Sequence, residues 1–120
     1  MESQRLQNKW NEGKNMEYFA HSLVCFMYEF LGNFVLVFAV NASLGNGPAV
    51  GLVYFFLNCL LVSITGAHFN PAVTLGVWIN KEKTWNTFIQ LISYSMAQVM
   101  GSLVSVTIMW NLQKDSTKTD

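Results

Sequence analysis

The sequence predicts an all-α membrane protein with three transmembrane helices and one re-entrant half-helix, and three observations carry this prediction. First, 52% of the 120 residues are hydrophobic and only 12% are charged, which is typical of a membrane protein. Second, Glu29 is the only acidic or basic residue between Tyr18 and Asn80. Third, the helix start Asn70-Pro71 directly follows an apolar segment. The apolar stretches predict the spanning helices, and the helix start predicts the half-helix.

The expected elements follow one another with short connections. The first apolar stretch is about 34 Å long as a helix, enough to cross a hydrocarbon core about 30 Å thick with some tilt. Turn residues at 46–48 precede a second stretch that is barely long enough, and a polar turn at 80–83 precedes the third. The elements are, in order, a flexible polar tail at 1–16, a membrane half-domain at 17–112 with spans 18–40, 49–65 and 87–110 and a half-helix 71–79, and a polar tail at 113–120.

The helix at residues 71–79 can cross only half of the membrane. Asn70 is its expected N-cap, and Pro71 suits the first helical position, where an amide donor is not needed. From there the helix would rise about 14 Å, half of the hydrocarbon core. Its N-terminus would bring a partial positive charge and unpaired amide donors to mid-membrane, which repels cations and protons. The carbonyls of the preceding residues 66–69 are tolerated at that depth only when they are buried or face water, so we interpret this loop as the wall of a pore.

Three motifs in this chain resemble the aquaporin family of major intrinsic proteins. The loop at residues 66–74 reads Gly-Ala-His-Phe-Asn-Pro-Ala-Val-Thr, as between the second and third membrane helices of that family. Glu29 followed by Gly32 resembles its Glu-x-x-Gly/Thr pattern, and Gln98 followed by Gly101 resembles its Gln-x-x-Gly pattern. The resemblance covers about residues 18–110, which corresponds to one of the two inverted halves of the family's pore.

The resemblance implies a channel for the passive transport of water and of small neutral solutes such as glycerol, with no catalytic activity and no cofactor. The other half of such a pore has no counterpart here, because the only prolines are Pro48 and Pro71 and no arginine follows Arg5. We therefore expect this chain to act as part of a longer channel, in a lipid bilayer, and the family usually forms tetramers. Two alternatives stay open: a half-subunit that pairs with another half, and a truncated, non-conducting protein that interferes with full-length channels.

The resemblance also implies roles for individual residues. Glu29 and Gln98 are expected to support the structure, with Glu29 accepting hydrogen bonds from the loop; a proton-relay role for Glu29 is an alternative. His68 could face the pore or brace the loop. The residues expected to line the pore or bind water are Gly66, Ala67, His68, Phe69, Asn70, Pro71, Ala72 and, by spacing alone, Val50.

The stripe Ala97, Gly101 and Ser105 predicts close packing against another helix, because small residues at this spacing share one helix face. Cys25 and Cys59 lie in apolar spans, where thiols are usually inert packing residues. We expect no metal site, because the cysteines and histidines have no ligand spacing.

Charge and motif content exclude other classes of function. The formal net charge is zero and no basic cluster is present, so no nucleic-acid partner is expected. No nucleophile-base pair or phosphate-binding loop indicates an enzyme. Five basic residues on one side of the spans against two on the other predict a cytoplasmic N-terminus. The five are Arg5, Lys9, Lys14, Lys81 and Lys83, and the two are Lys114 and Lys118.

Overall fold

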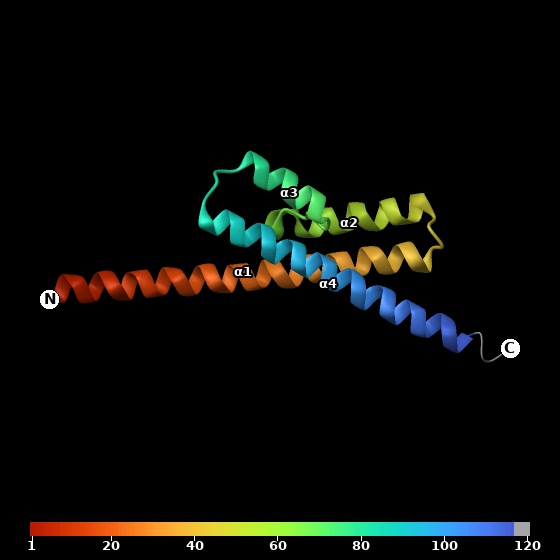
Figure 1. Cartoon of the computed structure of the whole chain (residues 1–120), viewed down its shortest axis with the longest axis horizontal. Coiled ribbons are helices and arrows are strands. Elements are labelled where there is room, and N and C mark those ends of the chain that lie inside the picture. Colours follow the sequence, from red (N-terminus) through yellow and green to blue (C-terminus); the bar gives the residue numbers. More distant parts are fainter. Residues whose placement is uncertain (117–120) are drawn as a thin grey trace.

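The computed structural model describes residues 1–116, which form four helices joined by short connections. These are α1 (Glu2–Ala42), α2 (Gly47–Thr65), α3 (Pro71–Asn80) and α4 (Trp85–Ser116) (Figure 1). By length and composition α1, α2 and α4 can cross a membrane, whereas α3 has only 10 residues. The predicted fold class, three transmembrane helices plus one half-helix, is confirmed.

Helix α1 is much longer than its expected span. Its 41 residues include the segment 2–16, for which we expected a flexible tail, and every residue before Cys25 is exposed. This segment contains no proline and is rich in glutamate, glutamine, lysine and other good helix formers, so the helix propagates backward from the membrane span. In Figure 1 this part of α1 extends well beyond the other helices. At the other end α4 takes in residues 113–116 of the second expected tail, and residues 117–120 lie outside the described residues.

The ends of the shorter helices follow local signals. Asn46 caps α2, because its Oδ1 accepts a hydrogen bond from the Ala49 amide at 3.1 Å. The last turn of α3 is capped by a lysine, since Lys83 Nζ donates to the carbonyls of Trp78 and Ile79, each at 2.7 Å. Asn41 lies in the last turn of α1, where its Nδ2 donates to the Val37 carbonyl at 2.8 Å.

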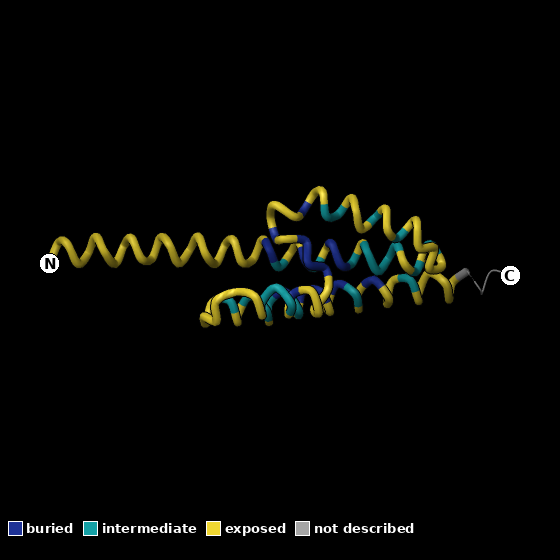
Figure 2. Tube along the Cα trace, turned by 90° about the horizontal axis from the view of Figure 1, so that it is seen from above, coloured by how far each residue is buried: buried dark blue, intermediate teal, exposed yellow. Residues whose placement is uncertain are grey.

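Helix packing centres on α1. Helix α4 crosses it, α2 runs beside it, and α3 packs on α4 (Figure 1). Buried residues gather in the middle of the bundle, where these elements meet (Figure 2). Several of them are polar, among them Glu29, Asn33 and Gln98. The core of this bundle is therefore a hydrogen-bonded network with apolar packing around it.

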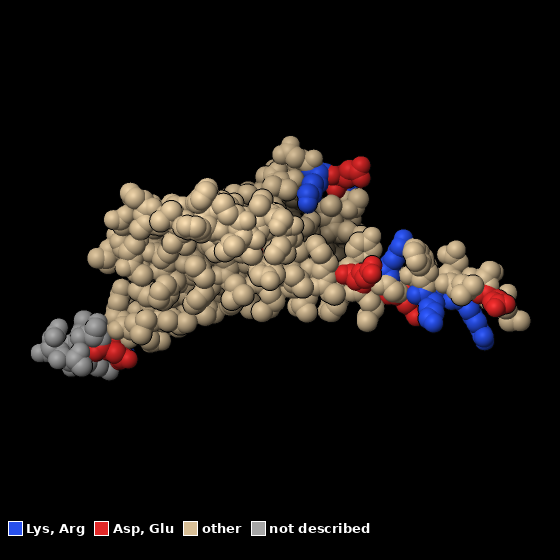
Figure 3. All heavy atoms as spheres, turned by 180° about the vertical axis from the view of Figure 1, so that it is seen from behind, with Lys and Arg blue, Asp and Glu red and all other residues tan. Residues whose placement is uncertain are grey.

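The outer surface is apolar between two charged ends. Figure 3 shows charged side chains at the N-terminal part of α1, at the turn between α3 and α4, and near the end of α4, with a broad uncharged band between them. Large hydrophobic side chains on the three long helices are exposed, such as Leu31, Phe55 and Leu103. An exposed apolar surface of this extent fits lipid and other membrane-embedded protein rather than water. The chain is an integral membrane protein.

Candidate functional site

The candidate site is the five-residue connection 66–70, which joins the end of α2 to the start of α3 near the middle of the bundle (Figure 1). Gly66 ends α2 in the left-handed conformation at φ 87°, and its amide donates to the Val62 carbonyl at 3.1 Å. Ala67 and Phe69 also have positive φ, at 51° and 47°. Non-glycine residues rarely adopt this conformation, so the surrounding contacts must hold the loop in place.

Glu29 of α1 is the main contact that holds the loop. Its side chain is 0% exposed and accepts four hydrogen bonds, which matches the capacity of an ionised carboxylate. Oε1 accepts from the Thr65 hydroxyl at 2.7 Å and from the His68 amide at 3.1 Å. Oε2 accepts from the Phe69 amide at 2.8 Å and from Gln98 Nε2 at 2.8 Å. One carboxylate thus joins α1, the end of α2, the loop and α4.

The amides of residues 66–69 are bound internally, whereas the carbonyls of the same four residues are not. The Ala67 amide donates to Thr65 Oγ1 at 3.0 Å, and the amides of His68 and Phe69 are bound by Glu29. Within residues 1–116, nothing donates to the carbonyl oxygens of residues 66–69. These four consecutive acceptors therefore have no partner among the described residues, although residues 67–69 are buried.

Asn70 connects this row of acceptors to the half-helix. It is the N-cap of α3, and its Oδ1 accepts from the Ala72 amide at 2.9 Å. Its carbonyl accepts from the Thr74 amide at 3.0 Å. The residue is exposed, and its side-chain Nδ2 donates to no group in the described part of the chain. Asn70 can thus offer a donor at the end of the acceptor row, next to the positive end of α3.

A second set of buried hydrogen bonds fixes the back of the half-helix. Gln98 of α4 is 0% exposed, and its Nε2 donates to Thr74 Oγ1 at 3.0 Å as well as to Glu29. The same Thr74 hydroxyl lies 3.2 Å from His68 Nδ1. Asn33 of α1 donates to the Gln98 carbonyl and to the Ser102 hydroxyl. Thr74 and Asn33 were not singled out from the sequence.

Apolar contacts position the remaining loop side chains. The Phe69 ring is 3% exposed and packs against Leu61 with Leu36 and Leu57 around it. Gly32 makes room for this ring, because a Cβ on Gly32 would lie 2.2 Å from Phe69 Cε1. Ala67 is equally buried. The side chains of Ala67 and Phe69 are therefore out of reach of a solute.

The other predicted residues lie at different distances from this loop. Pro71 and Ala72 are exposed in the first turn of α3, whereas Val50 is half-buried in the first turn of α2, at the opposite end of that helix from the loop. In α4, Ala97, Gly101 and Ser105 are all buried, and a Cβ on Gly101 would lie 2.3 Å from the Phe30 carbonyl oxygen of α1. Among residues 1–116, no three histidine, cysteine, aspartate or glutamate side chains gather as metal ligands.

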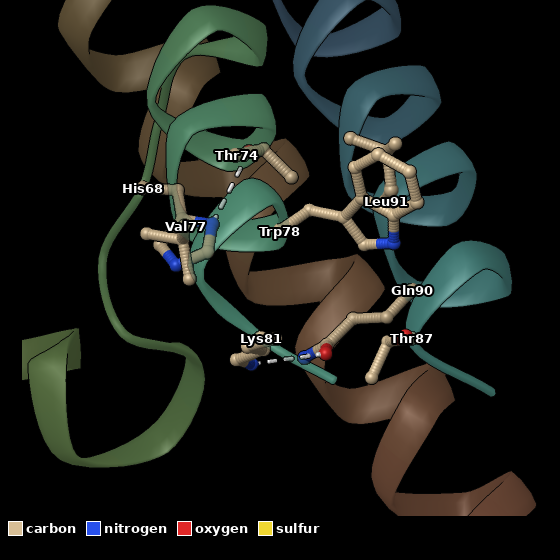
Figure 4. Close-up of a pocket in the computed structure, with 8 residues that line it drawn as sticks. All are labelled: His68, Thr74, Val77, Trp78, Lys81, Thr87, Gln90 and Leu91. Atoms are coloured by element: carbon tan, nitrogen blue, oxygen red, sulfur yellow. Dashed lines mark hydrogen bonds between the residues drawn. The ribbon is translucent and has the colours of Figure 1, made fainter. Parts of the chain in front are cut away.

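A small cavity lies between α3 and α4, behind the loop (Figure 4). His68 and Thr74 line one side and are joined by their hydrogen bond, while Lys81 and Gln90 are joined across the other side by a hydrogen bond of 3.2 Å. Its volume is about 10 Å³, which is room for roughly one water molecule. A solute such as glycerol does not fit there.

Comparisons with known proteins agree with the resemblance seen in the sequence. A family model described as Major intrinsic protein matches residues 16–120. The Glycerol uptake facilitator protein-like 6 of Lactiplantibacillus plantarum is 36% identical over 89 residues, which are 74% of this chain and 40% of that protein. Aquaporin Z of Photorhabdus laumondii is 32% identical over 96 residues, covering 68% of this chain and 40% of that protein.

A plant relative, Aquaporin NIP1-2 of Oryza sativa subsp. japonica, is 37% identical over 94 residues, covering 67% of this chain and 30% of that protein. The chain thus spans well under half of the length of these relatives. No solved structure matches the chain.

Proposed function

Because this chain belongs to the major intrinsic protein family, whose members are channels rather than enzymes, we propose that it forms one half of a membrane channel for the passive transport of water and small neutral solutes. The observation that supports this function is the pattern of hydrogen bonds in the loop 66–70. The amides of residues 67–69 are bound by Glu29 and Thr65, whereas the carbonyls of residues 66–69 accept no hydrogen bond from the described residues, and neither side-chain hydrogen of Asn70 Nδ2 is donated to them. Water and polyols donate and accept hydrogen bonds, so both can use such a row in single file.

The path would lie on the side of the loop that this half leaves uncovered. Gly66, Asn70, Pro71 and Ala72 are exposed, although the connection between α2 and α3 lies near the middle of the bundle (Figure 1). Polar backbone at this depth must be covered by protein or by confined water. We propose that a second, inverted half covers it in the working channel, and that complete channels assemble as tetramers.

Orientation follows from the charges at the two ends. Three basic residues of α1 and two in the turn between α3 and α4 lie at one end of the bundle (Figure 3). Lys114 lies at the other end, and Lys118 is outside the described residues. Short segments rich in lysine and arginine stay on the cytoplasmic side. We therefore place the N-terminus and the α3–α4 turn in the cytoplasm.

The function is tested with channels assembled from two halves. The chain is joined to the part of Aquaporin Z that it does not match, and separately to the corresponding part of the Lactiplantibacillus plantarum relative. Each protein is purified, shown to be folded and placed in liposomes, and vesicle shrinkage is followed after an osmotic step. We expect vesicles that carry at least one of the two joined proteins to shrink faster than empty vesicles. Vesicles that carry the chain alone should shrink at the rate of empty vesicles.

Two outcomes would contradict the proposal. If both joined proteins are folded and neither transports water or glycerol, the chain does not supply half of a pore. If, in addition, the chain lowers the permeability of full-length Aquaporin Z in the same vesicles, the interfering function replaces the proposed one.

We predict that Asn70→Asp weakens the exclusion of cations in the assembled channel. The carboxylate would place a negative charge beside the positive end of α3, where the neutral amide now lies. Cation conductance of vesicles carrying the joined channel should rise by about tenfold, as expected for an electrostatic change of roughly 1.4 kcal/mol. Asn80→Asp is the matched control, because Asn80 is also exposed but lies at the cytoplasmic end of α3. Equal cation conductance in the Asn70→Asp variant and the unchanged channel would refute this role of Asn70.

A further inference from the structure

Tyr94 of α4 lies directly behind the loop and has not been assigned a role. Its side chain is only 3% exposed. Its hydroxyl donates to the Thr65 carbonyl at 3.1 Å, and its ring meets the His68 ring edge to face, with ring centroids 5.3 Å apart and planes at 61°. The single side chain of Tyr94 therefore contacts both the end of α2 and the His68 imidazole of the loop.

The hydroxyl contact completes the end of α2. Thr65 is the last residue of this helix, and the chain turns away at Gly66, so no amide one turn later can bind the Thr65 carbonyl. An unpaired carbonyl is unfavourable inside a membrane. The Thr65 side chain is held by Glu29 at the same time. Tyr94 and Glu29 thus fix the residue from which the loop departs.

The ring contact limits the orientation of His68. Its amide is bound by Glu29, its Nδ1 lies 3.2 Å from Thr74 Oγ1, and Tyr94 packs against the ring. Only Nε2 is left without a partner among the described residues. This nitrogen lies over Gly66, since a Cβ on Gly66 would be 3.1 Å from it. Gly66 carries the first of the four unpartnered carbonyls, so the imidazole lies beside the start of this row.

We propose that Tyr94 is a positioning residue that directs His68 Nε2 toward the row of loop carbonyls and thereby influences which solutes pass. The proposal rests on the proposed function, because it assumes that solutes move along this row. The contact with Thr65 fixes the start of the row, and the contact with His68 fixes the imidazole beside it. Losing the hydroxyl releases the Thr65 carbonyl, whereas the ring that packs against His68 keeps its volume.

The first test does not depend on transport. The chain is labelled with ¹⁵N at histidine in lipid nanodiscs, and the imidazole signals of His68 are compared between the unchanged chain, Tyr94→Phe and Tyr94→Leu. We expect altered ¹⁵N shifts in Tyr94→Phe and broadened or split signals in Tyr94→Leu, which also loses the ring contact. Tyr28→Phe is the matched control, because Tyr28 is a more exposed tyrosine of α1 with no ring contact in the described structure. His68 signals that are identical in all four proteins would overturn the proposal.

The second test measures selectivity in the joined channel. The ratio of glycerol to water permeability should change by about fivefold in Tyr94→Phe, the bias that one hydrogen bond of ordinary strength gives to a two-state equilibrium. If Tyr94 had only a structural role, both permeabilities would fall in proportion and their ratio would stay the same. An unchanged ratio would therefore also refute the proposal. If the unchanged joined channel transports nothing, the proposed function fails, and the histidine signals still decide whether Tyr94 positions His68.

Discussion

Replacing Glu29 with leucine is expected to abolish transport in the assembled channel and to destabilise the loop more than any other single substitution in the site. The change leaves four donors without an acceptor, namely the amides of His68 and Phe69, the Thr65 hydroxyl and Gln98 Nε2. Each unpaired buried donor costs about 1–3 kcal/mol, and in the membrane no bulk water can replace the lost acceptor. The positive φ angles of Ala67 and Phe69 would then be held by packing alone. Osmotic shrinkage of vesicles measures the transport.

Glu29→Gln separates the charge of this residue from its shape. The amide oxygen can still accept two hydrogen bonds, but the amide nitrogen would face two donors. We expect the free energy of unfolding in detergent to fall by about 3 kcal/mol, the effect of losing hydrogen bonds to a charged group. Glu17→Gln on the exposed part of the same helix is the control and should leave the free energy of unfolding unchanged. An unchanged free energy of unfolding in Glu29→Gln would show that the four hydrogen bonds do not hold the loop.

Local signals predicted the elements of this fold well. The N-cap Asn70 and Pro71 act within one turn of their own position, so the start of α3 could be read from the sequence. Gly47 and Pro48, expected in a turn, already belong to α2, because Asn46 caps that helix. The resemblance to major intrinsic proteins, carried by the loop motif, is confirmed by the family match. The flexible tail expected at residues 1–16 is helical from Glu2 onward, because these polar residues include many good helix formers.

The hydrogen-bonded network could be predicted only in part. Glu29 stood out because an acidic residue in an apolar span needs a partner. Thr65, Tyr94 and Asn33 carry no such signal, since isolated polar residues of these types are common in membrane helices. Tyr94 and Asn33 bind partners 29 and 65 positions away, and Thr65 binds Glu29 36 positions away. No local period or spacing relates these residues, so the folded structure was needed to find them. The role of Val50 in a constriction stays a prediction.

The second large effect, a loss of stability, is expected from a substitution where α1 and α4 cross. In Gly101→Ala the new Cβ would lie 2.3 Å from the Phe30 carbonyl oxygen and 3.1 Å from the Phe34 amide nitrogen. Both are backbone atoms of α1, which cannot move aside as the end of a side chain can. The two helices must separate, and Gln98, one turn earlier in α4, would be drawn away from Glu29. Overpacking of this kind typically costs about 1–3 kcal/mol, and the loss of Gln98 contacts adds to it.

The comparison with another helical glycine makes this prediction specific. Gly51 lies in α2, and a Cβ on Gly51 would have no neighbouring atom within 4 Å, so Gly51→Ala meets open space. In a helix, alanine is more stable than glycine by about 0.5–1 kcal/mol. Gly51→Ala should therefore raise the free energy of unfolding, whereas Gly101→Ala should lower it. Denaturant titration in detergent measures both variants, and opposite signs are expected from the same chemical change. A stabilised Gly101→Ala variant would mean that α1 and α4 do not cross at Gly101. The placement of Gln98 beside the loop would then also be wrong.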